Sequence, residues 1–226
     1  MSIVAESFDV AIIGAGMAGA SLAAECAPYA RVLLVEAEET PGYHTTGRSA
    51  AFWEETYGGP GVFPLTMASG RFLREGGYLS PRGALNIGRA GDRDKVEAFV
   101  EKFSALGATL HLQDRAALEQ RGPGLRSDWV VGAWEPECAD IDVAGLHQHY
   151  LAASKRTGTV LRVRARVDRI VREGEGWRIV WNGGEARCAI LANAAGAWAD
   201  DVAVQAGAAA VGIRPLRRTI VQLRTE

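Results

Sequence analysis

A glycine-rich run near the start of the chain restricts its fold more than any other feature. Residues 8–13 read FDVAII, an almost continuous apolar run of the kind found in strands buried on both faces of a parallel sheet. Gly14, Gly16 and Gly19 follow at once with the spacing G-x-G-x-x-G. A helical stretch and a second apolar strand then lead to Glu36. This order predicts a dinucleotide-binding βαβ unit.

Each of the marked residues in this unit has a separate physical task. Gly14 permits the tight turn, Gly16 lets backbone N–H groups approach a pyrophosphate, and Gly19 lets the helix pack closely. Glu36 lies twenty residues after Gly16, where a carboxylate can accept hydrogen bonds from a ribose 2′-OH and would repel a 2′-phosphate. The alternative is a glycine-rich turn with a purely structural role.

Composition and charge place the chain among ordinary globular proteins. Its 226 residues are 48% hydrophobic, enough for a sizeable core, and the net charge of -2 implies no strongly charged partner. We expect no nucleic-acid binding, because the basic residues are scattered. The one group of arginines has mostly even spacing, which indicates a solvent-facing side of β-structure: Arg162, Arg164, Arg166, Arg169 and Arg172.

Cysteines and histidines indicate neither disulfides nor a metal site. Cys26, Cys138 and Cys188 have no C-x-x-C spacing, as expected in a reducing compartment. No leader and no apolar run of about 20 residues is visible, so we expect a cytoplasmic protein without a membrane span. The four histidines lack metal-ligand spacing: His44, His111, His147 and His149. His147 and His149 are two residues apart, so they point to different faces of a helix.

The middle of the chain departs from strict βα alternation. Residues 42–91 are rich in glycine and aromatic side chains, which indicates loops around a ligand. Residues 92–106 have helical apolar spacing, with Gly107 as a stop. Three short elements then indicate a second layer: a strand at 109–112, a helix at 116–120 and a strand at 130–134.

The last third of the chain predicts a return to the first domain. Residues 140–156 predict a helix that Asp142 can cap. Residues 160–192 predict strands, with a hairpin at Asn182-Gly183-Gly184. A second small-residue turn at 194–196 precedes another helical stretch, so its backbone N–H groups could also approach a dinucleotide.

Five motifs together resemble the D-amino-acid oxidase-like family of FAD-dependent oxidoreductases, and within it the D-arginine dehydrogenase-like members. They are GAGMAG with Glu36, GYHTTGRSAAFW, the V-x-x-I pattern at Val167–Ile170, ADID-x-x-x-LHQ-x-YL and NAAGAWAD. The resemblance implies a glutathione-reductase-like FAD/NAD(P)-binding Rossmann domain of α/β class with an inserted antiparallel-sheet substrate domain. The boundaries it implies are 1–80 and 141–206 for FAD binding, 81–140 for the substrate-domain excursion and 207–226 for the start of the substrate-domain sheet.

The resemblance also implies the residues that would hold FAD. They form four stretches with two further positions, Val167 offering its backbone to adenine and Trp198 packing nearby. The full set is Gly14, Ala15, Gly16, Met17, Ala18, Gly19, Glu36, Ala37, Thr45, Thr46, Gly47, Arg48, Ser49, Ala50, Ala51, Phe52, Val167, Ala194, Ala195, Gly196 and Trp198. An arginine among small hydroxyl residues, as at Arg48, also suits phosphate or flavin oxygens on chemical grounds. The alternative for Arg48 is an ordinary surface position.

The activity that the resemblance implies is oxidation of the C–N bond of a D-amino acid to an imino acid, and so to a 2-oxo acid and ammonia. Arg218 would bind the substrate carboxylate, with exposure to solvent as its alternative, and Tyr57 would lie over the substrate, with core packing as its alternative. Phe52 and Ala84 depart from the arginine-directed members, which carry a histidine and an acidic residue there. A cationic substrate tail would lack a partner, so we expect a neutral or hydrophobic one.

Alternatives remain open from the sequence. They are a relative that oxidises glycine, sarcosine or a 2-hydroxy acid, and a flavin-binding fragment without turnover. The electron acceptor is unknown. Members of the family extend further, so we expect a following segment or a second chain to complete the site.

Overall fold

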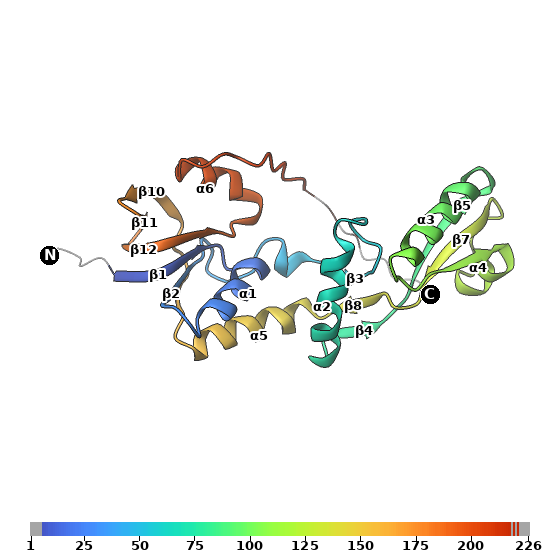
Figure 1. Ribbon diagram of the computed structural model, residues 1–226, viewed down its shortest axis with the longest axis horizontal. Helices are drawn as coiled ribbons and strands as arrows, with labels where there is room; N and C mark the ends of the chain where they lie inside the picture. Colours follow the sequence, from blue (N-terminus) through green and yellow to red (C-terminus); the bar gives the residue numbers. More distant parts are fainter. Residues whose placement is uncertain (1–5, 218, 220, 222–226) are drawn as a thin grey trace. The chain divides into compact units, whose positions relative to one another are not determined.

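The computed structural model describes residues 6–217, 219 and 221 and divides into two compact units (Figure 1). The first unit contains residues 1–49 and 144–226, and the second contains residues 50–143. The second unit is therefore an insertion within the first. This is the arrangement expected for a Rossmann-type domain with an inserted domain.

In the described part of the chain, the first unit contains a six-stranded sheet in the order β10-β11-β12-β1-β2-β9. Strands β12, β1, β2 and β9 are parallel to one another, whereas β10, β11 and β12 form an antiparallel meander. The bounds are β1 Glu6–Ile13, β2 Val32–Val35, β9 Val160–Arg162, β10 Val167–Glu173, β11 Gly176–Trp181 and β12 Gly184–Asn193. The predicted strand–turn–helix–strand unit and the Asn182–Gly184 hairpin are confirmed.

Strand β1 is buried on both faces, as its apolar run predicts. Val10 and Ile12 pack in one cluster with residues of α1 (Met17–Cys26), and Leu151 of α5 (Val143–Arg156) packs against it. Ala11 and Ile13 pack in the other cluster with Val202 of α6 (Ala199–Gln205). Figure 1 shows α1 and α5 on the opposite side of β1 and β2 from α6. The carboxyl end of β1 is thereby fixed between two packed layers.

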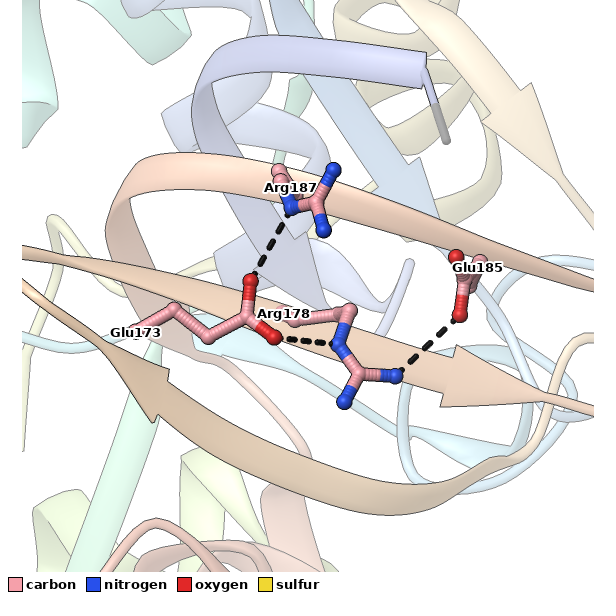
Figure 2. Close-up of polar contacts among 4 residues, drawn as sticks. All are labelled: Glu173, Arg178, Glu185 and Arg187. Atoms are coloured by element: carbon pink, nitrogen blue, oxygen red, sulfur yellow. Dashed lines mark hydrogen bonds and ion pairs between the residues drawn. The ribbon is translucent and has the colours of Figure 1, made fainter. Parts of the chain in front are cut away.

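Ion pairs connect the three strands of the meander. Arg178 and Arg187 lie directly opposite each other across β11 and β12, a like-charge pair that is unfavourable alone. Glu173 of β10 accepts hydrogen bonds from both, at 2.5 Å and 2.9 Å, and Glu185 pairs with Arg178 at 3.2 Å (Figure 2). These bonds hold the pKa of Glu173 below its ordinary value. The carboxylates therefore offset the repulsion between the two arginines.

The second unit contains two three-stranded antiparallel sheets among its described residues, β3-β8-β4 and β5-β7-β6. The core of this unit includes Phe63 of α2 (Phe63–Glu75) and Phe103 of α3 (Arg93–Ala105). The strands are β3 Phe52–Trp53, β4 Leu79–Pro81, β5 Ala84–Arg89, β6 His111–Asp114, β7 Trp129–Glu135 and β8 Ala139–Ile141. The helices are α2 Phe63–Glu75, α3 Arg93–Ala105 and α4 Arg115–Arg121. The predicted helices near 92–106 and 116–120 and the strand at 130–134 are confirmed.

Several expectations need correction. The helix predicted from residue 140 begins at Val143, because Ala139–Ile141 form β8 between β3 and β4. The strand predicted at 109–112 lies at His111–Asp114. The arginines from 162 to 172 do not share one strand face, because Arg164 lies in a turn with φ 51° between β9 and β10.

The expected domain boundary near residue 80 differs from the observed division. Residues 50–80 belong to the second unit because β3 and β4 both pair with β8. The sheet expected to start in 207–226 is absent from the described residues there. The backbone N–H groups of Val211, Gly212 and Ile213 instead donate to the Asp200 carboxylate, so they are not directed to a neighbouring strand.

Candidate cofactor site

A cleft of about 270 Å³ opens in the first unit. Its walls come from the segments that follow β1, β2 and β12, together with residues 42–46, 165–167 and α6. Ligands of open parallel sheets bind beyond the carboxyl ends of the strands, which is where this cleft lies. The volume is near the lower end of small-molecule pockets, about 300–1,000 Å³, and so suits part of a dinucleotide.

The glycine turn brings backbone unusually close to backbone. Gly14 has φ 102°, and a Cβ there would overlap the carbonyl oxygen of Ala194. A Cβ on Gly19 would overlap the carbonyl oxygen of Gly14, so a side chain at either position would push the turn apart. Gly16 caps α1, whose first residue, Met17, lines the cleft. The N-terminus of α1 therefore borders the cleft, where it favours an anion.

Glu36 lies at the end of β2 and is buried. One carboxylate oxygen accepts a hydrogen bond from the N–H of Ala15 at 2.9 Å, and the other accepts from the N–H of Glu38 at 3.0 Å. Its backbone N–H donates to Arg162 O and its carbonyl accepts from Ala165 N–H. The carboxylate is thus fixed on the cleft wall, where a negative charge suits a ribose hydroxyl and disfavours a 2′-phosphate.

Residues 42–46 form a further wall of the cleft, and Gly47 and Arg48 follow them. The Thr46 hydroxyl accepts a hydrogen bond from the N–H of Met17 at 2.9 Å, which joins this segment to α1. His44 lies 2.9 Å from Glu38 and its ring centroid is 4.6 Å from that of Trp198. Arg48 is exposed, with its guanidinium stacked 4.7 Å from the centre of the Tyr43 ring.

The second small-residue turn closes the cleft on the β12 side. The N–H of Ala194 donates to Ile13 O at 2.9 Å, and that of Ala195 donates to the Asn193 side chain at 3.2 Å. These two N–H groups are therefore engaged within the protein, contrary to the expectation that they face a dinucleotide. The turn instead offers small side chains that leave space in the cleft.

A comparison with protein families decides the assignment. Residues 9–226 match the DAO family, FAD dependent oxidoreductase. The chain belongs to this family. FAD is accordingly its cofactor. The residues of the cleft fit the adenosine and pyrophosphate half of FAD, because they combine a helix N-terminus, close-packed glycines and a carboxylate that could accept hydrogen bonds from a ribose.

Several solved protein structures share the fold of this chain. Glycine oxidase from Geobacillus kaustophilus has TM-score 0.79 and 21% identity, covering 89% of this chain and 59% of its own. L-proline dehydrogenase from P. horikoshii has TM-score 0.80 and 20% identity, covering 90% and 57%. L-alpha-glycerophosphate oxidase from Mycoplasma pneumoniae, with FAD bound, has TM-score 0.81 and 16% identity, covering 89% and 57%. The chain spans little more than half the length of these proteins.

Most of the residues predicted to hold FAD in this DAO-family chain lie together around the cleft. Those on its walls are Gly14, Gly16, Met17, Ala18, Glu36, Ala37, Thr45, Thr46, Val167, Ala194, Ala195, Gly196 and Trp198. Ala15, Gly19, Gly47, Arg48 and Ser49 belong to the same unit but do not line the cleft. Ala50, Ala51 and Phe52 belong to the second unit. Arg218 lies outside the described residues.

The sequence reasoning missed several lining residues. Glu38, Tyr43, Arg166, Asp201 and Gln205 also lie on the cleft walls. Asp201 and Gln205 are four apart in α6, so the helical spacing after the second turn was the available signal. Arg166 carried no signal, because its place depends on the turn that joins β9 to β10.

In the second unit, Tyr57 and Phe52 form an aromatic pair. Their ring centroids are 5.9 Å apart in an edge-to-face arrangement, and Tyr57 is 64% exposed, so core packing is wrong for this residue. The Arg82 guanidinium lies 5.2 Å from the centre of the Phe52 ring and 3.5 Å from Asp140. Ala84, at the start of β5, is half-buried. The pair therefore has a cation as its neighbour.

Among the residues that the structure describes, no group of three His, Cys, Asp or Glu side chains could hold a metal ion. Within the same residues, no helix has the length and apolar character required to cross a membrane.

Proposed function

We propose that this DAO-family chain oxidises D-amino acids with neutral or hydrophobic side chains to imino acids, which water converts to 2-oxo acids and ammonia. When bound, FAD supplies the two-electron oxidation by accepting a hydride from the substrate Cα. The residues of the chain itself would bind the cofactor and the substrate and orient them toward each other. The α1 N-terminus and Glu36 would hold the pyrophosphate and the adenosine ribose.

Substrate recognition is assigned to two residues. Arg218 would pair with the substrate carboxylate through a bidentate guanidinium contact. Tyr57 would cover the substrate, and its exposed ring makes it available to do so. Gly58 and Gly59 follow it with φ 81° and 79°, conformations that suit a tight loop.

The surroundings of Phe52 carry the proposal of a neutral side chain. The Arg82 guanidinium stacks on the Phe52 ring, beside Tyr57. In addition, residue 84, where the resemblance implies an acidic residue for a cationic substrate, is an alanine. A cationic side chain placed here would meet the like charge of Arg82, and the neighbouring Asp140 carboxylate is already paired with Arg82 at 3.5 Å. An apolar side chain would instead gain contact with the two rings.

The test is anaerobic addition of amino acids to the purified intact gene product with bound FAD, followed in the visible spectrum. We expect D-leucine, D-phenylalanine and D-methionine to bleach the flavin bands faster than D-arginine or D-lysine. Faster reduction by D-arginine would contradict the neutral-substrate proposal. Reduction only by glycine, sarcosine or a 2-hydroxy acid would replace the D-amino-acid assignment, and FAD that nothing reduces would support a binding role without turnover.

A matched variant sharpens this test. Ala84→Glu restores a carboxylate, so it should raise the reduction rate with D-lysine about tenfold relative to D-leucine, the scale of one new charge pairing. Ala84→Gln has similar size without the charge and should leave the preference near that of the parent. Equal effects of the two variants would show that charge at residue 84 does not select the substrate.

A further inference from the structure

A buried histidine on α5 lies against the glycine turn. His147 belongs to the sequence LHQ, a motif that carries the family resemblance but has no role so far, and is 4% exposed. Its Nε2 lies 2.9 Å from the carbonyl oxygen of Ala15. A carbonyl can only accept a hydrogen bond, so Nε2 carries the hydrogen and donates it.

Ala15 is the residue between the first two glycines of the turn. Its N–H donates to Glu36 and its carbonyl accepts from His147, so side chains from two distant elements hold both of its polar groups. Two residues later, the N–H of Met17 donates to the Thr46 hydroxyl. These three contacts fix the peptide planes that lead into α1.

The same imidazole also contacts the opposite wall of the cleft. Gly42 has φ 77°, and a Cβ there would lie 2.8 Å from Cε1 and 3.1 Å from Nδ1 of His147. The ring is therefore packed against the Gly42 backbone on one side and bonded to the Ala15 carbonyl on the other. The ring thus lies between two segments that both contribute residues to the cleft walls, Gly14–Ala18 and Gly42–Thr46.

We propose that His147 is a positioning residue for FAD. By holding the Ala15 carbonyl away from the cleft, it keeps carbonyl oxygen from facing the pyrophosphate and leaves the helix N-terminus directed at it. Without the Nε2 donor, a buried carbonyl loses its partner and the peptide can rotate. The inference rests on FAD binding alone and is independent of the amino-acid substrate.

The experiment measures FAD affinity of the intact apoprotein by flavin fluorescence, beside its thermal midpoint without FAD. His147→Leu should weaken FAD binding about tenfold or more, the effect of one unpaired buried acceptor. His147→Gln keeps an N–H donor in a similar place and should recover most of the affinity. His149→Leu, on the exposed side of α5, is the matched control and should bind within about twofold of the parent.

A second pair of variants covers the case in which His147→Leu does not fold. Gly42→Ala introduces a methyl group against the imidazole, so it should weaken FAD binding more in the parent than in a His147→Ala background, where the ring is gone. Strictly additive effects would overturn the proposal. So would a folded His147→Leu protein with the affinity of the parent, or loss of affinity in His147→Gln equal to that in His147→Leu.

Discussion

At the scale of single residues, the three cysteines differ in their surroundings. Cys138 is fully buried beside Glu54 and Glu135, and burial with these carboxylates raises the pKa of its thiol to about 11. Burial likewise raises the pKa of the Cys188 thiol. Cys26 is only partly buried. The thiolate is the reactive form of cysteine. Cys26 should therefore react faster than Cys188 and Cys138.

We therefore expect a thiol reagent at pH 8 to label Cys26 rapidly in the native protein and Cys138 and Cys188 only on unfolding. With an aromatic disulfide as the reagent, the absorbance of the aromatic thiolate that it releases measures the rate of labelling at each cysteine. Cys26→Ser should remove the fast phase, whereas Cys138→Ser should leave it unchanged. A fast phase that disappears in Cys138→Ser would contradict the burial of that thiol.

At the scale of elements, one carboxylate of β7 anchors the segment between β3 and α2. The fully buried Glu135 accepts hydrogen bonds from the backbone N–H groups of Glu55 and Thr56 and, at 2.9 Å, from the Thr56 hydroxyl. This segment leads directly to Tyr57. Burial is the main cause that raises the pKa of Glu135, and the hydrogen bonds oppose it.

A raised folded-state pKa fixes the direction of a pH effect. Between the ordinary value of 4.5 and the raised value, the folded protein binds more protons at Glu135 than the unfolded chain, so this group lowers the free energy of unfolding as pH rises. The parent should thus lose stability relative to Glu135→Gln as pH rises through that window. Urea unfolding at several pH values measures the difference.

The exposed Glu75 of α2 supplies the control for this measurement. Glu75→Gln should show no comparable pH-dependent difference from the parent, because that carboxylate is exposed. Glu54 and Glu55 also have raised pKa values and remain in every variant. The charge of Glu135 helps to raise the pKa of Glu55, so the difference between the parent and Glu135→Gln includes this coupling and has the same sign. A difference between parent and Glu135→Gln that is constant with pH would contradict the assignment.

At the scale of the whole molecule, the cleft is built from the first unit alone. Its lining residues fall within 1–49 and 144–226, although the whole second unit, residues 50–143, lies between these two stretches in the chain. A ligand that binds only the folded state stabilises it by mass action, by about 2.7 kcal/mol at a concentration one hundred times Kd. Stabilisation by bound FAD should therefore be strongest in the first unit, which holds the cleft.

We expect FAD to slow hydrogen exchange most strongly at residues 14–19, 36–38, 42–46 and 194–198. Strands β5–β7 of the second unit should change much less. Exchange measured by mass spectrometry with and without FAD gives the comparison. Protection confined to β5–β7 would place the cofactor elsewhere.

Short-range physics explains which features were predictable from the sequence. The run at 8–13, the glycine spacing, the helical pattern near 92–106 and the hairpin at 182–184 each depend on residues close in sequence. The same holds for the carboxylate at Glu36, since a βαβ unit fixes its distance from the turn. The sequence therefore determined the Rossmann-type unit and most of the residues on the cleft walls.

Tertiary structure decided what depends on distant partners. Strands β3, β4 and β8 have two or three residues each and exist only through mutual pairing, which moved the boundary from residue 80 to residue 49. His147 gave no sign in the sequence that it would meet Ala15, 132 positions away. Such contacts carry no local period, because only the packing of α5 on the sheet brings the two groups together.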